Sequence, residues 1–484
     1  MRQFGRLGSG LAITVAVGFG AACEDSKAKT DTGSTSTSPS ETVDGADGIN
    51  ENPWAAPTET NAFRVAFANR GRIQGQNTDE NELWLMDPDG KNQFALTELA
   101  KLADLEEPLS CNYGCIVSPN LRWLAVVAAP PGPNGYTLKF GKFNSSLEVK
   151  IVKGVEFTNI VDYKFAGDRV FFTRKKGCTG SSCQFEFTVI ELAENVNEQI
   201  PFLVFPPDND LASSTYTGRF RVSEDGKLMV LLNTTIRSTH VYLWKDGTGL
   251  VELDFICKFG NIEHCEGTGS EYTDIDPVAI DPLGRYVVFF TFADRWQRIR
   301  VYDVANPGQA QSAIAASVDQ GNYIERVCNA GQLAEWQWPK VVGNPVFTPD
   351  GEEILFLTKN DCAVNGVPVD KAQTNILRVK VATLLSGKTL EESDIFNVTK
   401  NPKGNVTANR LTNAFSVASD GATVIFTATP SYDQNGNLIA DGSARQRNDN
   451  EVYRVRLDGT NIQQLTNDVS YSAESPLCVS PTNP

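Results

Sequence analysis

Histidine and positive charge are both scarce in this sequence of 484 residues. It contains two histidines, His240 and His264, and 43 lysines and arginines against 59 aspartates and glutamates, for a formal net charge of −16. Two histidines are too few for a metal site built from several imidazoles. A protein that follows a nucleic-acid backbone needs a basic face, so the acidic balance argues against a nucleic-acid partner. The hydrophobic content of 41 % is nevertheless that of a globular protein with a large core.

The sequence also lacks an apolar run long enough to cross a membrane as a helix, which takes about 20 residues. The apolar stretch at 11–20 is about half that length; it follows Arg2 and Arg6 and ends in small residues. A basic start, a short apolar segment and small residues before a cleavage site are typical of a secretory signal peptide. We therefore expect an exported protein.

The sequence around Cys23 resembles a bacterial lipobox, with Gly20 where an aliphatic residue is usual. The resemblance implies that residues 1–22 are a lipoprotein signal peptide and that Cys23 carries the lipid. Glu24 replaces the aspartate that favours retention in the inner membrane, so we expect an envelope protein anchored at the outer membrane, on its periplasmic or surface face. The alternative is an ordinary signal peptide that leaves a free cysteine.

Residues 23–60 are expected to form a disordered, flexible tether. They are rich in serine, threonine, glycine and aspartate and have almost no large apolar side chain before Trp54. Such a segment cannot bury a core of its own. The folded domain is therefore expected at 61–484.

A repeated phrase organises this domain. Each copy has an extended stretch, a turn of the Ser-Pro-Asp-Gly kind and an apolar strand, as in 346–351 followed by 354–357. Asp-Gly pairs suit turns that require a positive φ, and alternating β-branched and aromatic residues suit half-buried strands. Copies of the phrase lie at 116–120, 163–168, 220–226, 279–284, 346–351 and 416–421.

A second phrase combines an alternating strand, a polar turn and a short last strand, most clearly at 83–97 and 452–466. Four short strands per unit, separated by turn signals, predict the blade of a β-propeller. The two phrases resemble the TolB-like propeller repeat, a WD-like repeat common in bacterial exported proteins. The resemblance implies an all-β propeller and leaves the activity open, because this repeat serves many functions.

We expect a seven-bladed β-propeller closed by the C-terminal strand. The first unit begins at Phe63 with what is already a second strand, and an orphan first strand lies at 475–481. Pairing the two would remove open sheet edges. The alternative is a ring of six blades with the weak unit 157–205 as an insertion. Innermost strands near 115, 163, 220, 278, 345, 415 and 477 give the count of seven.

The ten cysteines are expected to be oxidised, since the chain is exported. A Cys111–Cys115 bond is the alternative to a Cys115–Cys478 bond, but four residues of straight strand would hold Cys111 and Cys115 about 13 Å apart, too far for a disulfide. Zinc is a competing interpretation, although no CxxC pair repeats. With Cys23 set aside for lipid, the candidate disulfides are Cys178–Cys183, Cys257–Cys265, Cys328–Cys362 and Cys115–Cys478.

The sequence carries no GxSxG or phosphate-loop motif, so we assign no catalytic residues. The loop 433–441 has alternating oxygen side chains around a glycine turn, a spacing similar to that of a calcium loop without its final glutamate. Ca²⁺ is therefore the one cofactor considered, with an ordinary Asn-Gly turn as the alternative. The candidate calcium ligands are Asp433, Asn435, Asn437 and Asp441.

Long insertions at 305–340, 360–374 and 429–450 belong to the last three units. Insertions gathered in one sector are where a partner surface is built. We expect a monomeric, non-catalytic envelope lipoprotein whose propeller is a binding or assembly scaffold for an envelope protein or a cell-wall polymer. The alternative is a carbohydrate-active lyase or hydrolase that uses carboxylates in the propeller channel. Loop tryptophans are expected either to form a glycan or peptide platform or to wedge between blades: Trp54, Trp296, Trp336 and Trp338.

Overall fold

The structure, a computed structural model, describes the strands of an all-β protein together with many of the turns between them. The predicted segments 1–22 and 23–60 lie outside the described residues, so the signal peptide, the lipid anchor and the tether stay predictions. The described residues are 63–72, 79–96, 115–132, 135–143, 149–151, 157–179, 182–192, 203–205, 220–234, 238–257, 271–272, 278–293, 297–305, 316–318, 340–360, 373–386, 392–399, 404–406, 415–430, 451–466 and 471–479.

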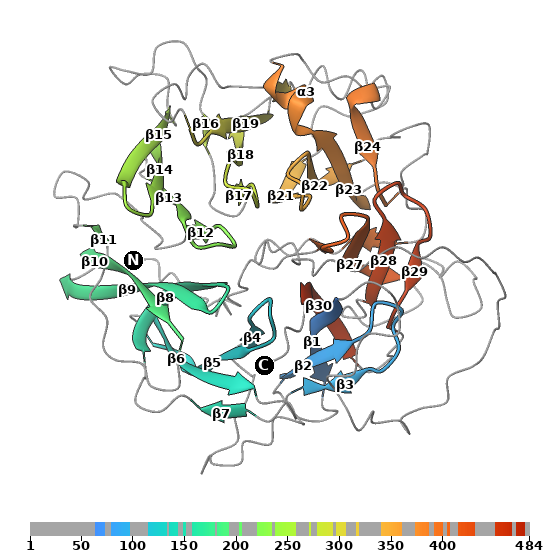
Figure 1. Ribbon diagram of the computed structural model, residues 1–484, viewed down its shortest axis with the longest axis horizontal. Coiled ribbons are helices and arrows are strands. Elements are labelled where there is room, and N and C mark those ends of the chain that lie inside the picture. The colour runs from blue at the N-terminus through green and yellow to red at the C-terminus, as the bar shows by residue number, and fades with distance from the viewer. Residues whose placement is uncertain are drawn as a thin grey trace, which may run out of the picture.

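Six β-sheets stand around a common axis and form a β-propeller (Figure 1). Each sheet is one blade, and the blades are numbered in chain order. Blade 1 contains β30 (Tyr471–Val479), β1 (Arg64–Arg72), β2 (Asp79–Met86) and β3 (Phe94–Ala95). Blade 2 contains β4 (Cys115–Val117), β5 (Trp123–Gly132), β6 (Gly135–Phe143), β7 (Val149–Ile151), β8 (Phe157–Ala166), β9 (Arg169–Thr179), β10 (Ser182–Glu191) and β11 (Leu203–Phe205).

Blade 3 contains β12 (Phe220–Val222), β13 (Leu228–Thr234), β14 (Ser238–Lys245) and β15 (Gly249–Cys257). Blade 4 contains β16 (Glu271–Tyr272), β17 (Val278–Ile280), β18 (Tyr286–Ala293), β19 (Gln297–Asp303) and β20 (Ala316–Val318). Blade 5 contains β21 (Lys340–Phe347), β22 (Glu353–Asn360), β23 (Gln373–Lys380) and β24 (Ile395–Asn397), with the short helix α3 (Val381–Leu385) and the 3-10 turn η4 (Glu392–Asp394). Blade 6 contains β25 (Gly404–Val406), β26 (Phe415–Val417), β27 (Thr423–Pro430), β28 (Glu451–Arg456) and β29 (Gln463–Gln464).

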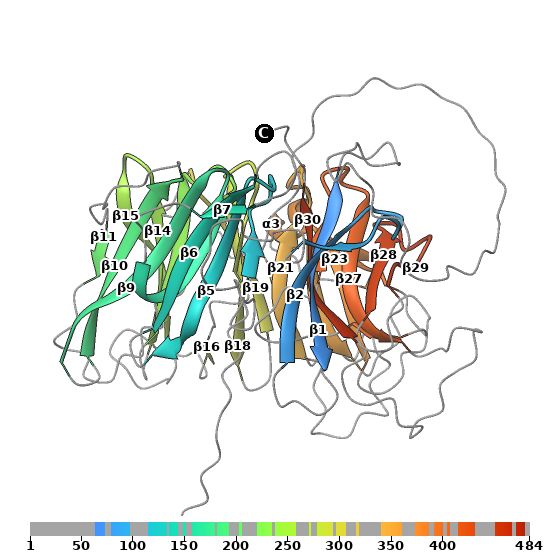
Figure 2. The same cartoon turned by 90° about the horizontal axis from the view of Figure 1, so that it is seen from below.

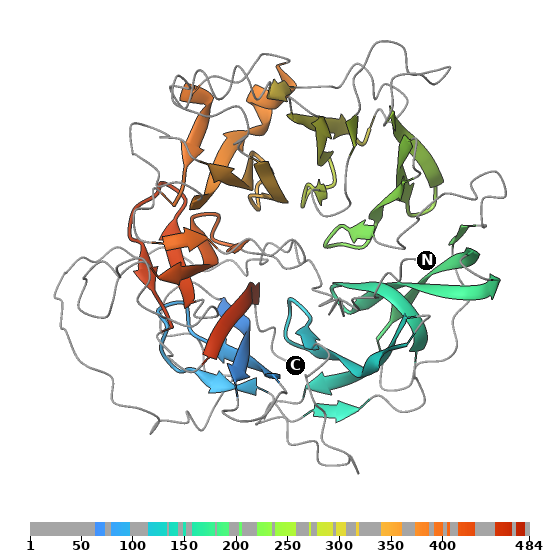
Figure 3. The same ribbon diagram turned by 180° about the vertical axis from the view of Figure 1, so that it is seen from behind.

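The C-terminal strand closes the ring. β30 lies beside β1 at the inner edge of blade 1 (Figure 3), and the two strands are antiparallel, with Val65 opposite Cys478 and Ala66 opposite Leu477. The predicted closure of the first unit by the end of the chain is therefore confirmed. The first and last segments of the propeller share one sheet, which leaves no open inner edge at this point.

The expectation of seven separate blades is wrong and the alternative of six blades is confirmed, because the described strands form six sheets. The strands of the second and third expected units belong to one eight-stranded sheet, blade 2. The join is made by β6 and β8, where Tyr136 lies opposite Ile160 and Leu138 opposite Phe157. The unit 157–205 is thus neither an insertion nor a separate blade, but the second half of blade 2.

Apolar side chains fill the space between consecutive sheets and also between the two halves of blade 2. In blade 2, Phe157 packs against Phe140 and Phe172, with ring centroids 5.8 and 4.9 Å apart. These rings belong to one buried cluster that joins β4–β6 to β8–β10. Aromatic pairs of this kind stabilise beyond their buried area, so the halves hold each other face to face as well as edge to edge.

β30 shows how strand alternation distributes side chains between two such cores. Leu477 and Val479 pack toward blade 2, whereas Cys478 packs toward blade 6, among Ala418 and Ile425. This follows because successive side chains of a strand point to opposite faces. The thiol of Cys478 is buried and free. The predicted Cys115–Cys478 disulfide is therefore not formed, since β4 lies on the other side of blade 1.

The propeller has two unlike faces. The turn face carries the short turns that join the innermost strand of a unit to its second strand, at the upper edge of Figure 2. At the opposite end, which we call the loop face, second strands connect to third strands and each unit passes to the next. The turns of the turn face include 118–123, 166–169, 223–228, 281–286, 348–353 and 418–423.

Candidate functional site

Turns of the turn face share a hydrogen-bonded design that the Ser-Pro-Asp-Gly phrase encodes. The hydroxyl of Ser223 donates to Asp225 Oδ1 at 2.7 Å and accepts the N–H of Leu228 at 2.9 Å. Gly226 takes the positive φ of 65° that the turn requires. Thr348 takes the place of the serine in the turn 348–353, and its hydroxyl donates to Asp350 Oδ1 at 2.6 Å. The predicted turn positions are therefore confirmed down to the side chains that close them.

Neighbouring turns dock directly on one another, as blades 4 and 5 show. Asp281 is fully buried and accepts the Nε–H of Arg285 at 2.7 Å and its backbone N–H at 3.0 Å. Arg285 then donates to the backbone oxygen of Asp350 in the next turn at 2.8 Å. A Cβ on Gly351 would overlap both the Asp281 carboxylate and the Arg285 guanidinium. Only glycine fits there, so the turn face is a close-packed rim at this point.

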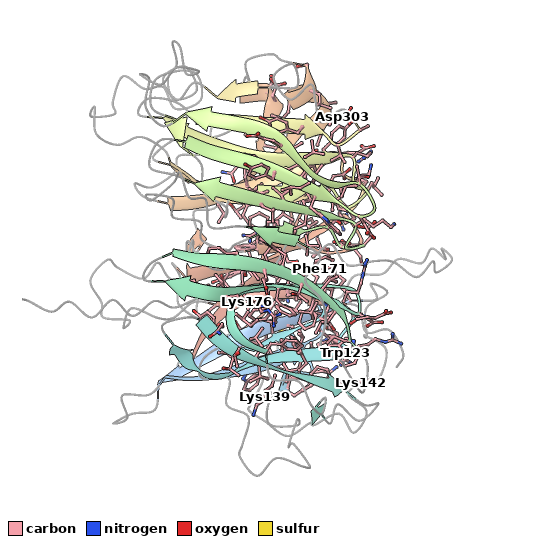
Figure 4. All side chains as sticks on the ribbon, turned by 90° about the vertical axis from the view of Figure 1, so that its left-hand side faces the viewer. Trp123, Lys139, Lys142, Phe171, Lys176 and Asp303 are labelled. Carbon is pink, nitrogen blue, oxygen red and sulfur yellow. The ribbon has the colours of Figure 1, made fainter. Side chains whose placement is uncertain are left out.

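Asp168 makes the equivalent link between the halves of blade 2. Its carboxylate accepts hydrogen bonds from Asn120 Nδ2 at 2.9 Å, Arg122 NH1 at 2.9 Å and Trp123 Nε1 at 3.0 Å. Burial alone would raise the pKa of Asp168, but these three donors and the Arg122 charge lower it. Lys142 lies over the Trp123 ring, 5.7 Å from its centroid, near the same end of the propeller (Figure 4). The carboxylate is thus a structural acceptor held in its ionised form.

A buried ion pair lies on the inner strand β8. Asp162 and Lys164 are 7 % and 6 % exposed, and their charged atoms lie 2.9 Å apart. The other Asp162 oxygen accepts the backbone N–H of Phe220, the first residue of blade 3, at 3.2 Å. Burial, and then the Asp162 charge, raises the pKa of the intervening Tyr163. The pair links blade 2 to blade 3, and its charges compensate each other.

Glu186 is a buried carboxylate at the centre of a second charge cluster in blade 2. It is 4 % exposed and lies 2.8 Å from Arg174 and 2.9 Å from Lys176. Burial alone would raise the pKa of Glu186, but hydrogen bonds and charge from the two cations lower it. One carboxylate between two cations leaves an excess positive charge at this corner of an acidic protein.

Strand ends locate two of the predicted insertions on the loop face. β22 and β23 pair as far as Asn360 and Gln373, so the connection 361–372 leaves blade 5 there. β27 and β28 pair as far as Ala428 and Glu451, so the connection between them leaves blade 6 from the same face. The third insertion begins after β19 at the turn face and reaches β21 at the loop face. The described strand ends that flank two of the long connections therefore lie at the loop face of neighbouring blades.

The backbone places some of the predicted disulfide cysteines, but their pairing stays a prediction. Cys178 and Cys183 lie in β9 and β10, beside the hairpin connection 180–181, as the sequence predicted. Cys257 ends β15 and Cys115 begins β4. The side chains of these four residues are outside the description. Cys265, Cys328 and Cys362 lie wholly outside the described residues, as does Cys23.

The predicted calcium and aromatic sites also fall outside the described part of the chain. This holds for the calcium ligands Asp433, Asn435, Asn437 and Asp441. It holds equally for the tryptophans Trp54, Trp296, Trp336 and Trp338. Within the ranges that the structure describes, no three His, Cys, Asp or Glu side chains gather as metal ligands. Among those same ranges, no helix combines the length and apolar character needed to cross a bilayer.

Comparison with known proteins assigns this chain to no family. The sequence matches no protein-family model and no curated protein. Among solved structures, TolB from Acinetobacter baumannii is 12 % identical over 87 % of this chain and 83 % of that chain, with a TM-score of 0.37. The β-propeller domain of the Trilobed protease from Pyrococcus furiosus is 12 % identical over 84 % of this chain and 96 % of its own, with a TM-score of 0.43.

An acylaminoacyl peptidase from Pyrococcus horikoshii is 14 % identical over 84 % of this chain, with a TM-score of 0.44. The match covers 51 % of the peptidase, so this chain spans about half of its length. These similar structures are propeller proteins with different activities. The strand pairing described above defines this chain as an all-β propeller, and neither it nor these likenesses assigns an activity.

Two charged features of the site were missed by sequence reasoning. Asp162 and Lys164 alternate with buried apolar residues in the second half of β8, and this i, i+2 pair of opposite charges was a usable signal. Asp168 was recognised only as part of a weak turn. Its three donors come from Asn120, Arg122 and Trp123 in the preceding half of the blade. A contact of this kind, between residues far apart in sequence, leaves no local pattern.

Proposed function

We propose that this chain is a non-catalytic envelope lipoprotein whose propeller is a binding or assembly scaffold. In this proposal Cys23 carries the lipid, residues 23–60 are the tether, and the propeller works as a monomer held at the outer membrane. Its partner is an envelope protein or a cell-wall polymer that contacts the loop face of blades 5 and 6.

The observation that carries the proposal is the difference between the two faces. Turns on the turn face dock on one another, as Gly351 does on Asp281 and Arg285. The connections 361–372 and 429–450 both start and end at the loop face of adjacent blades. Loops positioned by a rigid scaffold are the common site of binding function. A calcium ion bound at 433–441 would be part of this surface.

The described carboxylates also support a binding role over carboxylate catalysis. A glycosidase acid needs a carboxyl group whose pKa is raised. The described carboxylates with a shifted pKa are Asp168, Glu186 and Asp225, and each is shifted downward. Hydrogen bonds and neighbouring cations that outweigh burial produce each shift. A lowered pKa of this origin is typical of carboxylates that accept hydrogen bonds in a structural role.

Loop replacement tests the binding surface. Asn360 and Gln373 face each other at the ends of β22 and β23, so 361–372 can be replaced by Asn-Gly, a two-residue hairpin turn. Residues 429–450 are replaced in the same way, between Ala428 and Glu451, which face each other at the ends of the β27–β28 pairing. Partners captured from detergent-solubilised envelopes are quantified by mass spectrometry, and binding to insoluble cell wall by sedimentation. We expect a partner that both replacements together remove.

The matched control replaces 235–238 by Asn-Gly at the end of β13 and β14. This hairpin is on the same face but in blade 3, so the control should keep the partner. If every captured protein and polymer survives the double replacement, the binding surface is wrong.

The lipid anchor is tested separately. Radiolabelled palmitate should enter the wild-type chain expressed in a bacterial host, and the Cys23→Ser variant should stay unlabelled and leave the membrane fraction. Equal labelling of the two chains would contradict the lipoprotein assignment without affecting the loop-face result.

A further inference from the structure

The half of β9 next to the hairpin concentrates positive charge in an acidic protein. Arg174, Lys175 and Lys176 are consecutive in a chain whose formal net charge is −16. β9 and β10 pair as far as Thr179 and Ser182, so these residues lie toward the loop-face end of blade 2. Figure 4 shows Lys176 farther from the turn face than Trp123. A positive group of this kind attracts anions to one corner of a molecule that otherwise repels them.

Strand register places two of the three cations beside one carboxylate. Glu186 lies opposite Arg174 in the β9–β10 pairing, and Lys176 follows Arg174 by two positions on the same face. Lys175 points to the other face, because successive side chains of a strand alternate. It is half-buried and makes no ion pair with a described residue. Glu186 is thus shared by two cations, and the group as a whole keeps an excess of positive charge.

Glu186 holds both cations without using all of their donors. Its carboxylate is 4 % exposed and lies 2.8 Å from Arg174 Nε and 2.9 Å from Lys176 Nζ. Nε is the one guanidinium nitrogen of Arg174 that donates to a described residue, and the Lys176 side chain is 60 % exposed. A guanidinium group binds oxyanions through two parallel N–H groups. NH1 and NH2 of Arg174 and the outer N–H groups of Lys176 are therefore available to a ligand.

A buried hydroxyl on the same face also lacks a partner. Thr188 is 1 % exposed, and its Oγ1 makes no hydrogen bond. It lies opposite Phe172, two positions before Arg174, so Thr188 and Arg174 are diagonal neighbours. Buried polar atoms without a partner are rare, because each one costs free energy. The unused groups on this face are donors, and they favour a ligand with several acceptor oxygens and negative charge.

We propose that Arg174, Lys176 and the Thr188 hydroxyl bind a phosphate monoester group. Such a group has three free oxygens and a charge of about −1.5 to −2 at pH 7, so it matches three separate donors and the excess positive charge. A carboxylate has two oxygens and one charge. Glu186 is a positioning residue that keeps the two cations together. Thr188 Oγ1 is closed to solvent, so we expect the ligand to reach it as the exposed Lys176 side chain moves outward.

The probe is inorganic phosphate, titrated against the full chain at constant ionic strength. Binding is followed by broadening of the ³¹P resonance, and hydrogen exchange locates the contact. We expect saturable binding and slower exchange of amides within 172–176 and 184–188. Acetate at an equal concentration should displace little of the phosphate. The site is in blade 2, so the result is independent of the partner surface proposed for blades 5 and 6.

Two conservative variants test the geometry of the site. Arg174→Lys keeps the charge and removes the guanidinium fork, so it should weaken phosphate binding about tenfold. Thr188→Val removes the hydroxyl at nearly constant shape and should weaken binding about threefold. Without phosphate, the melting temperature of Thr188→Val should be unchanged or higher, because a buried hydroxyl without a partner is lost.

A matched pair of lysine variants tests charge alone. Lys176→Gln should weaken phosphate binding about tenfold. Lys91→Gln is the control, because Lys91 is also an exposed lysine with a carboxylate partner, Asp89, but it lies in blade 1 at the turn-face end. The control should bind phosphate as tightly as the wild type. Thermal melts of all four variants establish that the fold is kept.

Three results would overturn the proposal. The first is an equal loss of affinity in Lys91→Gln and Lys176→Gln, which would indicate diffuse attraction by charge. The second is unchanged affinity in both Arg174→Lys and Thr188→Val, or equal competition by acetate, because either would show that no phosphate geometry is recognised. The third is amide protection outside blade 2, or no saturable broadening with the wild-type chain.

Discussion

At the scale of single residues, the charged groups of the turn face act as clamps between units that are distant in sequence. Asp168 accepts three side-chain donors from the other half of blade 2, and Arg285 reaches across to the turn of blade 5. Each clamp fixes a turn whose local geometry is already closed by its own Ser, Thr or Asp. The contribution of each clamp is therefore best measured as a change in the free energy of unfolding.

Asp168→Asn should lower the free energy of unfolding at pH 7 by about 1 kcal/mol, since charge-assisted hydrogen bonds are replaced and partial exposure screens them. The folded-state pKa of Asp168 is lowered, so its contribution is complete above the unfolded pKa, about 3.9. It should vanish as the pH falls through the folded value. Urea unfolding followed by tryptophan fluorescence at pH 7 and below pH 4 measures this.

Glu352→Gln, at an exposed position of the turn face, is the control and should change stability little at either pH. A difference between Asp168→Asn and wild type that persists unchanged at acidic pH would assign the loss to packing instead of charge.

Alanine substitution of two glycines distinguishes the stability lost to backbone strain from the stability lost when turns no longer dock. Gly351 and Gly167 both have a positive φ, of 67° and 59°. A Cβ at Gly351 would overlap Asp281 and Arg285, whereas nothing lies within 4 Å of a Cβ at Gly167. Gly167→Ala should cost about 1 kcal/mol from the backbone alone. Gly351→Ala should cost about 2 kcal/mol more, because the buried Asp281 carboxylate and its partner Arg285 must move. Equal melting temperatures of the two variants would contradict turn docking.

At the scale of elements, the sequence phrases located strands well and sheets less well. The turns expected at 220–226 and 346–351 join β12 to β13 and β21 to β22, because Gly and Asp at these positions determine a local geometry. The number of sheets depends on which strands hydrogen-bond, and the β6–β8 join rests on two residue pairs without a turn signal. Repeat counting therefore cannot give the blade count.

The same limit explains why the predicted Cys115–Cys478 disulfide is wrong. Closure by β30 was predictable because the first unit lacks its innermost strand and an orphan first strand lies at 475–481. The face to which Cys478 points was not, because a shift of one residue in register moves a side chain to the other face. The candidate partner surface was predictable from insertion lengths.

The join within blade 2 predicts that its halves unfold together. Phe157→Ala should lower the free energy of unfolding by about 3 kcal/mol, because it removes a ring packed on Phe140 and Phe172. Hydrogen exchange should then speed up in both β5 and β9. Phe94→Ala, at a partly buried position in blade 1, is the control. Faster exchange confined to β8–β11 in the Phe157 variant would show two independent blades.

At the scale of the whole molecule, the ring depends on one seam. β30 and β1 come from opposite ends of the domain and pair over most of their length. Blade 1 is thus the blade whose loss opens the ring, and the free thiol of Cys478 lies in it, directly opposite Val65. This pairing offers a direct way to measure what closure contributes.

Val65→Cys should form a disulfide with Cys478, because the two residues are Cα partners and lie in the same buried cluster. A cross-link between the ends of the domain restricts the unfolded chain, so the oxidised variant should be more stable than its reduced form by about 3 kcal/mol. Bond formation is established by peptide mapping and stability by guanidinium unfolding with and without reductant. The control variant combines Val65→Cys with Cys478→Ser, so it carries the same core substitution but cannot form the bond. Reductant should not change the stability of this control. If the mapped bond left the unfolding midpoint unchanged, the β1–β30 seam would not limit unfolding, and the ring would have to open between other blades first.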